Sequence, residues 1–435
     1  MAQAPPLAVV ILAGGQGKRL GFDGPKVLVP VCGEPSLFYV IDAAAEVGAD
    51  RTLVVVCHRK EEVEAYLRRL PRIETVDQGE PIGTGHAVLQ TATSLEAHAG
   101  DVLVLFGDSP LVRGQTLTRL VAQHRSRGPK CTVATAVLEQ PTGYGRIVRR
   151  PDGTLRSVIE EKDATDEVRA IHEVHCGIAV FEAQALFRAL RRVTPQNVQS
   201  EYYLTDVYWL LQEDGGRVEV FSLAEADEGM GFNTPQDLLH CRTVLRRRIL
   251  EQHSERGVQI EDPDTVFIDR NVEIGRGTRI LPFSVLRGPS RIGSHCEVGP
   301  FSHLRPGTVL NDGAEVGNFV EVKNSELGEH VKAKHLSYLG DTLIGERTNI
   351  GAGTITANYD GKAKHRTVIG RKAFIGSGTI LVAPVKVGDG ATTGAGAVVP
   401  KGHNVEAGST VVGVPAREID KRVSRSVVSK EPDDA

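Results

Sequence analysis

The sequence has few aromatic residues, no recognisable metal-binding cysteine pattern and no long apolar run. Aromatic residues make up 5% of its 435 positions, with a single tryptophan. The six cysteines are scattered, without the CxxC pair or Cys/His spacing of a zinc site. No stretch approaches the ~20 apolar residues of a membrane-spanning helix. We therefore expect a cytoplasmic protein with reduced thiols and no membrane span.

Two further absences concern charge and the N-terminus. The formal net charge is −4, so the basic surplus typical of a nucleic-acid-binding protein is missing. Residues 1–6 lack the basic region that precedes the apolar segment of a secretory signal. We accordingly expect small-molecule partners, no nucleic acid and no export.

Glycine, in contrast, is abundant and unevenly spaced. Of the 47 glycines, 23 fall in residues 1–265 and 24 in the shorter stretch 266–435. In the second stretch the chain has an aliphatic residue at every sixth position from 292 to 322. A six-residue period fits neither a helix nor an alternating strand, but is typical of a parallel β-helix. A glycine-rich loop region is the alternative, which the many in-phase repeats disfavour.

The first half has a different pattern. Residues 37–47 and 61–70 have helical periodicity. Four short apolar runs predict buried strands: residues 7–13, 54–57, 101–106 and 132–137. Alternating strands and helices are typical of an α/β sheet covered on both faces. Apolar residues at helical spacing over 235–257 predict a connecting helix that ends at Gly257.

A glycine-rich turn follows the first apolar run. The sequence reads LAGGQGKRL over residues 12–20 and PKVL over residues 25–28. Glycines let backbone amides approach a phosphate, and Arg19 could neutralise its charge. The turn is neither a GxGxxG fingerprint nor a P-loop. Together with the PKVL segment it resembles the sugar-1-phosphate nucleotidyltransferases.

Later motifs narrow this resemblance. They are Gln78, GTGH at 83–86, FGD at 106–108, GYGR at 143–146, EEKD at 160–163, EYYLTD at 201–206 and GFN at 231–233. With the hexapeptide half, the chain from about residue 8 to about 416 resembles the bifunctional N-acetylglucosamine-1-phosphate uridylyltransferase/glucosamine-1-phosphate N-acetyltransferase family. The resemblance implies four segments: an α/β, Rossmann-like nucleotidyltransferase domain (1–234), a connecting helix (235–257), a left-handed parallel β-helix of hexapeptide repeats (258–418) and a tail (419–435).

For the first domain, the resemblance implies uridylyl transfer from UTP to N-acetylglucosamine 1-phosphate, with release of pyrophosphate. Arg19 and Lys26 would bind the triphosphate and stabilise the reacting phosphorus, and Asp108 and Asn233 would hold Mg²⁺. Gln78, Gly83 and Thr84 would contact the uracil, and Gly145, Glu160 and His175 the amino sugar. The remaining implied nucleotide-site residues are Leu12, Ala13, Gly14, Gly15 and Gly107.

For the second domain, the resemblance implies transfer of an acetyl group from acetyl-CoA to glucosamine 1-phosphate. His335 matches the position of a general base, for which the ordinary pKa of an imidazole is suited. Arg305, Lys323, Tyr338 and Asn349 would bind glucosamine 1-phosphate. Ala352, Asn358, Tyr359, Ser377 and Ala395 would line the acetyl-CoA site. The resemblance also implies a homotrimer that supplies UDP-N-acetylglucosamine for peptidoglycan and the cell wall.

Three positions depart from the family pattern. His175 stands where the family usually has asparagine, and Phe106 stands where it often has tyrosine, which is a milder change. Gly413 falls near the place of an arginine that would contact CoA. One alternative is therefore a nucleotidyltransferase for another sugar or nucleotide, whose β-helix serves assembly or a different acylation. Another is a non-catalytic trimeric scaffold, which Arg19, Lys26, Asp108 and Asn233 speak against.

Overall fold

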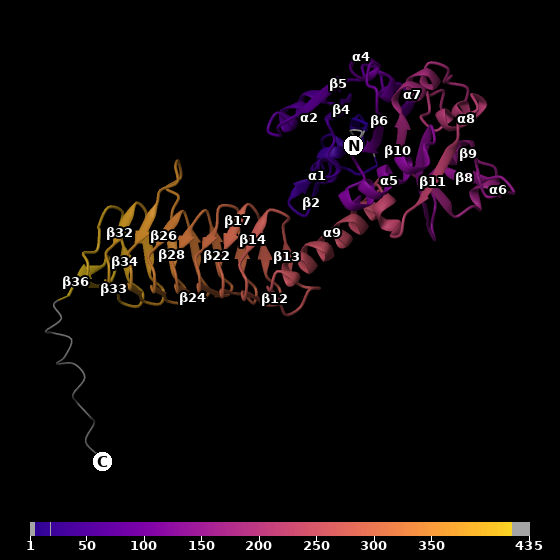
Figure 1. Ribbon diagram of the computed structural model, residues 1–435. Helices are drawn as coiled ribbons and strands as arrows, with labels where there is room; N and C mark the ends of the chain where they lie inside the picture. Colours follow the sequence, from indigo (N-terminus) through magenta and orange to yellow (C-terminus); the bar gives the residue numbers. More distant parts are fainter. Residues whose placement is uncertain (1–4, 18, 420–435) are drawn as a thin grey trace. The chain divides into compact units, whose positions relative to one another are not determined.

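The computed structural model describes residues 5–17 and 19–419 of the chain (Figure 1). It divides into two compact units, residues 1–245 and 246–435, and the boundary falls inside helix α9 (Pro235–Glu255). Gly257 follows this helix with a φ of +90°, a conformation that favours glycine. Residues 420–435, which make up nearly all of the predicted tail, lie outside the described residues.

The first unit is built on a nine-stranded sheet whose main path runs β11-β7-β10-β6-β1-β4-β5. Strand β10 is antiparallel to β6 and β7, and the other neighbours on this path are parallel. An antiparallel hairpin of β8 and β9 lies beside β10. The strands are β1 (Leu7–Leu12), β4 (Arg51–Val56), β5 (Ile73–Asp77), β6 (Asp101–Phe106), β7 (Cys131–Val137), β8 (Arg146–Arg149), β9 (Leu155–Ile159), β10 (Glu173–Glu182) and β11 (Val218–Ser222).

Helices cover both faces of this sheet. Val10 of β1 enters a core with side chains from α3, α7 and α8, whereas the next-door Val9 enters a core with α1, α2 and α5. Both faces of β1 are buried, which explains its unbroken apolar sequence and confirms the predicted α/β arrangement. The helices are α1 (Ser36–Glu46), α2 (Lys60–Leu67), α3 (Thr84–Leu89), α4 (Ala92–Leu95), α5 (Gly114–Arg127), α6 (Asp166–Arg169), α7 (Ala183–Leu190) and α8 (Asp206–Glu213).

Short elements complete the first unit. They are the 3-10 helices η1 (Lys26–Leu28), η2 (Glu161–Asp163) and η3 (Ala226–Gly229), and the strand pair β2 (Pro30–Val31) and β3 (Glu34–Pro35). The beginning of α9 packs here as well, because Leu238 and Cys241 share a small core with Val31 and Phe232.

The second unit is a parallel β-helix with three sheets. Ile280 pairs with Val298 and Val298 with Val316, so aliphatic residues eighteen positions apart stack in the interior, as the hexapeptide period predicts. The first sheet contains β12 (Gln259–Ile260), β15 (Arg279–Ile280), β18 (Glu297–Val298), β21 (Glu315–Asn318), β24 (Lys332–His335), β27 (Asn349–Ile350), β30 (Phe374–Ile375), β33 (Thr392–Thr393), β35 (Thr410–Val412) and β36 (Arg417–Glu418).

The other two sheets have the same repeat. The second contains β13 (Phe267–Ile268), β16 (Val285–Leu286), β19 (His303–Leu304), β22 (Glu321–Lys323), β25 (Tyr338–Gly340), β28 (Ile355–Ala357), β31 (Ile380–Val382) and β34 (Val398–Val399). The third contains β14 (Val272–Ile274), β17 (Ser290–Ile292), β20 (Val309–Leu310), β23 (Glu326–Leu327), β26 (Thr342–Ile344), β29 (Thr367–Ile369) and β32 (Val385–Val387).

One loop projects from the β-helix. Residues 358–366 lie between β28 and β29, and a bridge between Tyr359 and Lys364 closes the loop on itself (Figure 1). The sequence predicts an extruded loop at this interruption of the hexapeptide register. We name residues 358–366 the projecting loop.

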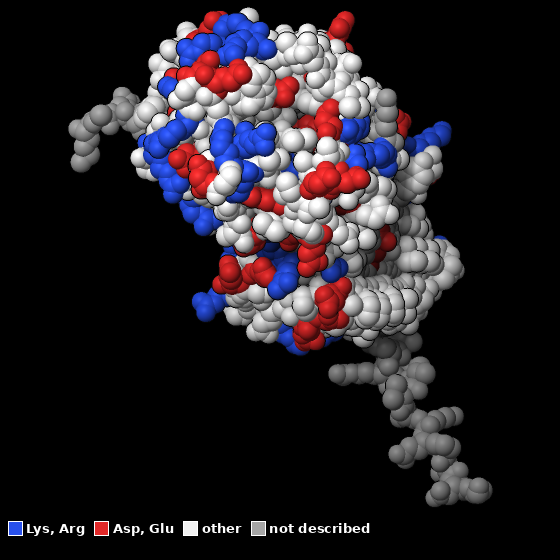
Figure 2. Space-filling model, turned by 90° about the vertical axis from the view of Figure 1, so that its right-hand side faces the viewer, with Lys and Arg blue, Asp and Glu red and all other residues white. Residues whose placement is uncertain are grey.

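Charged residues of both signs occur on the surface. On the face shown in Figure 2, lysine and arginine side chains are interspersed with aspartate and glutamate. No disulfide joins the described cysteines. Within the described ranges, no helix has both the length and the hydropathy that crossing a membrane requires.

Candidate active sites

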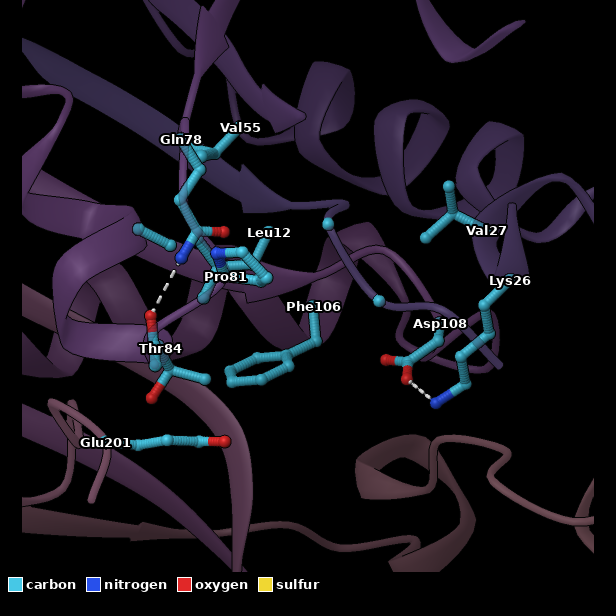
Figure 3. A pocket seen from close by; sticks show the side chains of 14 residues that line it. Leu12, Lys26, Val27, Val55, Gln78, Pro81, Thr84, Phe106, Asp108 and Glu201 are labelled. Carbon is cyan, nitrogen blue, oxygen red and sulfur yellow. Dashed lines mark hydrogen bonds and ion pairs between the residues drawn. The ribbon is translucent and has the colours of Figure 1, made fainter. Parts of the chain in front are cut away.

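The first site lies where two parallel strands end. Leu12 closes β1 and Phe106 closes β6, and the two residues are register partners. Strand β4 flanks β1 on its other side. The chain therefore continues from β1 to one side of the sheet, toward β4, and from β6 to the opposite side, toward β7. In open α/β sheets, ligands bind in the crevice at such a point. A cavity of about 240 Å³ occupies it here (Figure 3).

Most residues predicted for nucleotide binding line this cavity. They are Leu12, Gly14, Gly15, Lys26, Gln78, Gly83, Thr84 and Asp108. Ala13 and Gly107 are buried next to it, in hydrogen bonds to the ends of neighbouring strands. Arg19 is exposed and is not among the lining residues that the structure describes. Its predicted contact with the triphosphate stays a prediction.

Lys26 is the buried cation of the site. Its side chain is 8% exposed and forms an ion pair with Asp108 Oδ2. Lys26 Nζ also donates a hydrogen bond to Asn233 Oδ1 at 2.8 Å and lies 5.6 Å from the centre of the Phe232 ring. The three predicted polar groups therefore meet at one point, although they come from η1, the end of β6 and the segment before α9.

The start of helix α9 holds Asn233 in place. Thr234 and Asp237 form a reciprocal cap, in which Asp237 N donates to Thr234 Oγ1 and Asp237 Oδ2 accepts from Thr234 N. The same carboxylate oxygen accepts from the backbone N–H of Asn233 at 2.8 Å. The helix cap thus fixes the backbone from which the Asn233 amide reaches Lys26.

The oxygens of Asp108 and Asn233 also fit a divalent cation. Both converge on the Lys26 ammonium, so they already surround one positive charge. Mg²⁺ is commonly bound by one or two carboxylates together with substrate phosphates, rather than by an all-protein cage. The described residues contain no group of three or more His, Cys, Asp or Glu arranged for a metal ion.

Glycines shape the other end of the cavity, where Gln78 and Thr84 lie (Figure 3). A Cβ on Gly14 would lie 3.0 Å from Gln78 Oε1, so a larger residue would displace that amide. Gly83 has a φ of +124°, and a Cβ there would lie 2.4 Å from Tyr202 O. Gln78 Nε2 donates to Gly83 O at 3.1 Å. A bare backbone and a fixed amide suit recognition of a planar polar ring.

Of the predicted sugar-contacting residues, Gly145 lies just before β8, Glu160 just after β9, and His175 on β10. The backbone N–H of His175 donates to Gly145 O at 2.8 Å. Thr205 Oγ1 donates to Glu160 Oε1 at 3.0 Å, and burial raises the pKa of Glu160. The His175 side chain is buried, with Nε2 2.7 Å from Tyr208 Oη. Gly145, Glu160 and His175 are not among the residues that line the described cavity.

Six residues that line the cavity were not predicted from the sequence to bind the nucleotide: Val27, Val55, Pro81, Ala87, Phe106 and Glu201. Phe106 and Glu201 belong to recognised motifs, which is a signal that could have found them. Pro81 carries no such signal, because its place in the cavity depends on how the loop before α3 folds.

The second site lies on the β-helix. His335 ends β24, is exposed, and pairs in register with Asn318. In the neighbouring sheet Glu321 pairs with Tyr338 and accepts a hydrogen bond from Arg305 Nη1 at 2.8 Å. The predicted base and the predicted sugar-phosphate residues therefore lie on consecutive coils.

Three cations gather next to these residues. Lys364, on the projecting loop, lies close enough to Lys323 to lower its pKa, and Arg305 adds to the effect. Repulsion between ammonium groups is relieved when an anion binds between them. Lys364 was not predicted, because only the folded loop brings it to Lys323.

The base of the projecting loop is fixed by a carboxylate. Asp341 accepts hydrogen bonds from Asn358 Nδ2 and, at 2.6 Å, from Asn324 Nδ2. A Cβ on Gly340 would lie 2.5 Å from Tyr338 Oη and 2.8 Å from Asn358 Nδ2, so the structure brings these predicted residues together. Tyr359 is 61% exposed on the loop.

Along one corner of the β-helix, large apolar residues are followed by small residues. Phe283, Phe301 and Phe319 stack with ring centres 4.8 and 5.1 Å apart, and Leu336 follows on the next coil. All four side chains are 45–65% exposed. We name them the apolar column. Beyond it the corner holds only small residues: Ala352-Gly353, Ser377-Gly378 and Ala395-Gly396. His335 directly precedes Leu336, the last residue of the apolar column. The small residues that follow leave room for an extended ligand. Asn349 lies on β27 nearby.

Comparisons with known proteins agree with both halves. The MobA-like NTP transferase domain family matches residues 9–200, and the bacterial transferase hexapeptide (six repeats) family matches residues 271–303, 289–324 and 366–401. The chain is 40% identical over 426 residues to the bifunctional protein GlmU of Thermoanaerobacter pseudethanolicus, covering 90% of this chain and 92% of that protein.

Two more relatives carry the same name. The bifunctional protein GlmU of Desulfitobacterium hafniense is 40% identical over 460 residues, which cover 98% of this chain and 99% of the relative. That of Thermobifida fusca is 39% identical over 464 residues, which cover 98% and 96%. The likeness therefore extends over both units.

Proposed function

Because this chain belongs to the GlmU family, we propose that it carries out two reactions of UDP-N-acetylglucosamine synthesis. The β-helix transfers an acetyl group from acetyl-CoA to glucosamine 1-phosphate, and the α/β unit joins the product to UTP with release of pyrophosphate. The observation that carries the proposal is the presence of two polar centres: Lys26 with Asp108 and Asn233 in one unit, and a group of three cations on the coils next to that of His335 in the other.

Uridylyl transfer depends on position and charge. A phosphate oxygen of the sugar phosphate attacks the α-phosphorus of UTP, and the bond from that phosphorus to the leaving pyrophosphate breaks. Lys26 and Arg19 would neutralise the charge that spreads over the phosphate oxygens. Gln78, Gly83 and Thr84 would orient the uracil, with Gly14 and Gly15 against the phosphates.

The donor set supports a magnesium requirement. Asp108 and Asn233 would hold Mg²⁺, which supplies further neutralisation of the triphosphate. Asp108 and Asn233 already face the buried Lys26 ammonium, so charge within the site depends on all three groups.

Acetyl transfer needs a base. The amine of glucosamine 1-phosphate is mostly ammonium near neutral pH and must lose a proton before its nitrogen attacks the thioester carbonyl. His335 would take that proton, and the carbon–sulfur bond breaks to release CoA. Arg305, Lys323 and Lys364 would hold the sugar phosphate, with Tyr338 and Asn349 orienting the amine.

The small-residue part of the corner would take acetyl-CoA. Ala352, Ser377 and Ala395 project little from consecutive coils, and the glycines after them have positive φ values that suit them. Asn358 and Tyr359 stand beside this part on the projecting loop. Together these residues would form one wall of the acetyl-CoA site.

We infer that three copies assemble side by side. The apolar column is exposed along one corner, and stacked phenylalanines in water are costly unless another surface covers them. A neighbouring copy packed there would also cover the exposed His335 side chain. The chemistry of both reactions and the absence of disulfides among the described cysteines support a cytoplasmic enzyme that feeds cell-wall synthesis.

Two assays test the proposal with the purified full chain. Pyrophosphate release from UTP should require N-acetylglucosamine 1-phosphate and Mg²⁺, and CoA release should require glucosamine 1-phosphate. Pyrophosphate release without CoA release would leave the β-helix as a scaffold. Release with another sugar phosphate in preference would support the alternative nucleotidyltransferase.

A further inference from the structure

A histidine and a tyrosine form a buried hydrogen-bonded pair in the first unit. His175 Nε2 lies 2.7 Å from Tyr208 Oη, and the two rings meet edge to face with centres 5.5 Å apart. Tyr208 is in turn stacked on Phe181, with ring centres 5.9 Å apart and planes within 2°. His175 is 9% exposed and Tyr208 is fully buried. The pair therefore belongs to the core between the sheet and α8.

Hydrogen bonds connect both members to the sugar end of the site. On one side, the backbone N–H of His175 donates to Gly145 O at 2.8 Å. On the other side, Tyr208 lies one helical turn after Thr205, which precedes α8 and donates from Oγ1 to Glu160 Oε1 at 3.0 Å. Gly145 and Glu160 are themselves neighbours, because a Cβ on Gly145 would lie 3.6 Å from Glu160 Oε2. The contacts close into a ring.

Charge is consistent with this ring. Burial lowers the pKa of His175 to about 4, so its imidazole is neutral at neutral pH and does not compete with substrate for the Glu160 carboxylate. Burial raises the pKa of Tyr208 most, and the Glu160 charge adds to this shift, which places the carboxylate near the hydroxyl. The pair thus supports Glu160 without neutralising it.

In place of the direct contact that the sequence predicts for His175, we propose that His175 and Tyr208 are positioning residues for the sugar phosphate. They hold the start of α8 and the strand at Gly145 at a fixed separation, and so fix where the Glu160 carboxylate meets the sugar. This inference rests on the proposed uridylyl transfer. It assigns to the pair a role in discriminating the substituent on the sugar, and no role toward UTP.

The test compares Tyr208→Phe with wild-type enzyme in the full chain. Phenylalanine keeps the stack on Phe181 and removes only the hydroxyl. Loss of one buried hydrogen bond predicts a rise of about 10-fold in KM for N-acetylglucosamine 1-phosphate. The KM for UTP and the rate of CoA release should stay within about 2-fold of wild type. Neither His175 nor Tyr208 lines the nucleotide cavity, and both belong to the first unit. The preference for N-acetylglucosamine 1-phosphate over glucosamine 1-phosphate should fall.

A second variant and a matched control separate positioning from general destabilisation. His175→Leu should give the same selective rise in KM, and the double variant should add little, because the two residues act as one unit. The control is His124→Leu, which breaks another buried histidine–hydroxyl bond, between His124 Nδ1 and Thr132 Oγ1 at 3.0 Å. This variant should lower the unfolding temperature but leave the sugar-phosphate KM unchanged.

Two outcomes overturn the inference. One is an unchanged KM for the sugar phosphate in folded Tyr208→Phe. The other is an equal rise in the KM values for sugar phosphate and UTP. A direct sugar contact by His175 would instead appear as a defect in His175→Leu that Tyr208→Phe lacks. Failure of the proposed function is distinguishable, because wild-type enzyme would then release no pyrophosphate from UTP.

Discussion

Lys26 Nζ donates a hydrogen bond to Asn233 Oδ1 at 2.8 Å, although 207 positions separate the two residues. The bond joins the loop after β1 to the segment that begins α9. Because Asp108 contacts the same ammonium, the three residues form one charged centre at the edge of the sheet. The position of this centre depends on the helix cap at Thr234 and Asp237.

Replacing Asp108 by alanine should abolish uridylyl transfer. The change removes the carboxylate that would hold Mg²⁺ and leaves the buried Lys26 ammonium without its ion-pair partner. Loss of one preorganised electrostatic group commonly costs about 10²–10³-fold in turnover. Pyrophosphate release measures this effect, with CoA release in the same preparation as the control. A fall in both activities in a folded variant would contradict separate sites.

The sugar-phosphate KM should depend on the ionisation of Glu160. Burial, with Asp163, Asp206 and Glu201 adding repulsion, raises the pKa of this carboxyl above its ordinary value. As pH falls through that raised value Glu160 gains a proton, so its bond to a sugar hydroxyl weakens and KM rises. Glu160→Gln should have a higher KM without this acid limb. The titration of the substrate phosphate is common to both enzymes, so only a pH profile of KM in Glu160→Gln with the same shape as that of wild type excludes Glu160.

Lys364 should bind the phosphate of glucosamine 1-phosphate. Lys364 lowers the pKa of Lys323, so both ammonium groups face the same space. Hydrogen bonds to charged groups contribute about 1.5–3 kcal/mol, which predicts a rise of about 10- to 100-fold in the glucosamine 1-phosphate KM for Lys364→Met. Lys362→Met is the control, because Lys362 lies on the same loop and is not among the causes of that shift. Equal effects of the two changes would rule out a specific phosphate contact.

The apolar column should mediate assembly. Phe301 lies in its middle, stacked on both sides, and is 45% exposed. Aspartate tolerates the positive φ of this corner, so Phe301→Asp should fold while placing a charge in the interface. Sedimentation equilibrium should show dissociation at micromolar concentration and loss of CoA release. Val414→Asp alters another exposed apolar residue and should remain assembled. A Phe301→Asp trimer with full acetyl transfer would contradict the proposed interface.

The sequence predicts the periodic parts of the fold well. Strand β1 and the β-helix coils follow from repeated burial of aliphatic side chains, which leaves a visible period. The antiparallel insertion of β10 between β6 and β7 was not predicted, because strand order depends on contacts between distant segments. The hairpin of β8 and β9 was missed for the same reason.

Candidate site residues show the same division. Lys26, Asp108 and Asn233 belong to motifs that the sequence displays, and the structure brings them together. Lys364 and Tyr208 belong to none of these motifs, because the role of each depends on the side chain that lies opposite it, Lys323 or His175. Such pairs become visible only when the chain is folded.

Turnover of both reactions in His335→Ala tests whether the β-helix carries its own catalytic base. A positioned base contributes about 10²–10⁴-fold, so CoA release should fall at least about 100-fold. Pyrophosphate release from UTP with N-acetylglucosamine 1-phosphate should stay near wild type, because His335 lies in the second unit alone. If His335→Ala retained more than about a tenth of wild-type acetyl-transfer turnover, the loss would be smaller than a general base usually contributes. That result would contradict the assignment of His335 as the base.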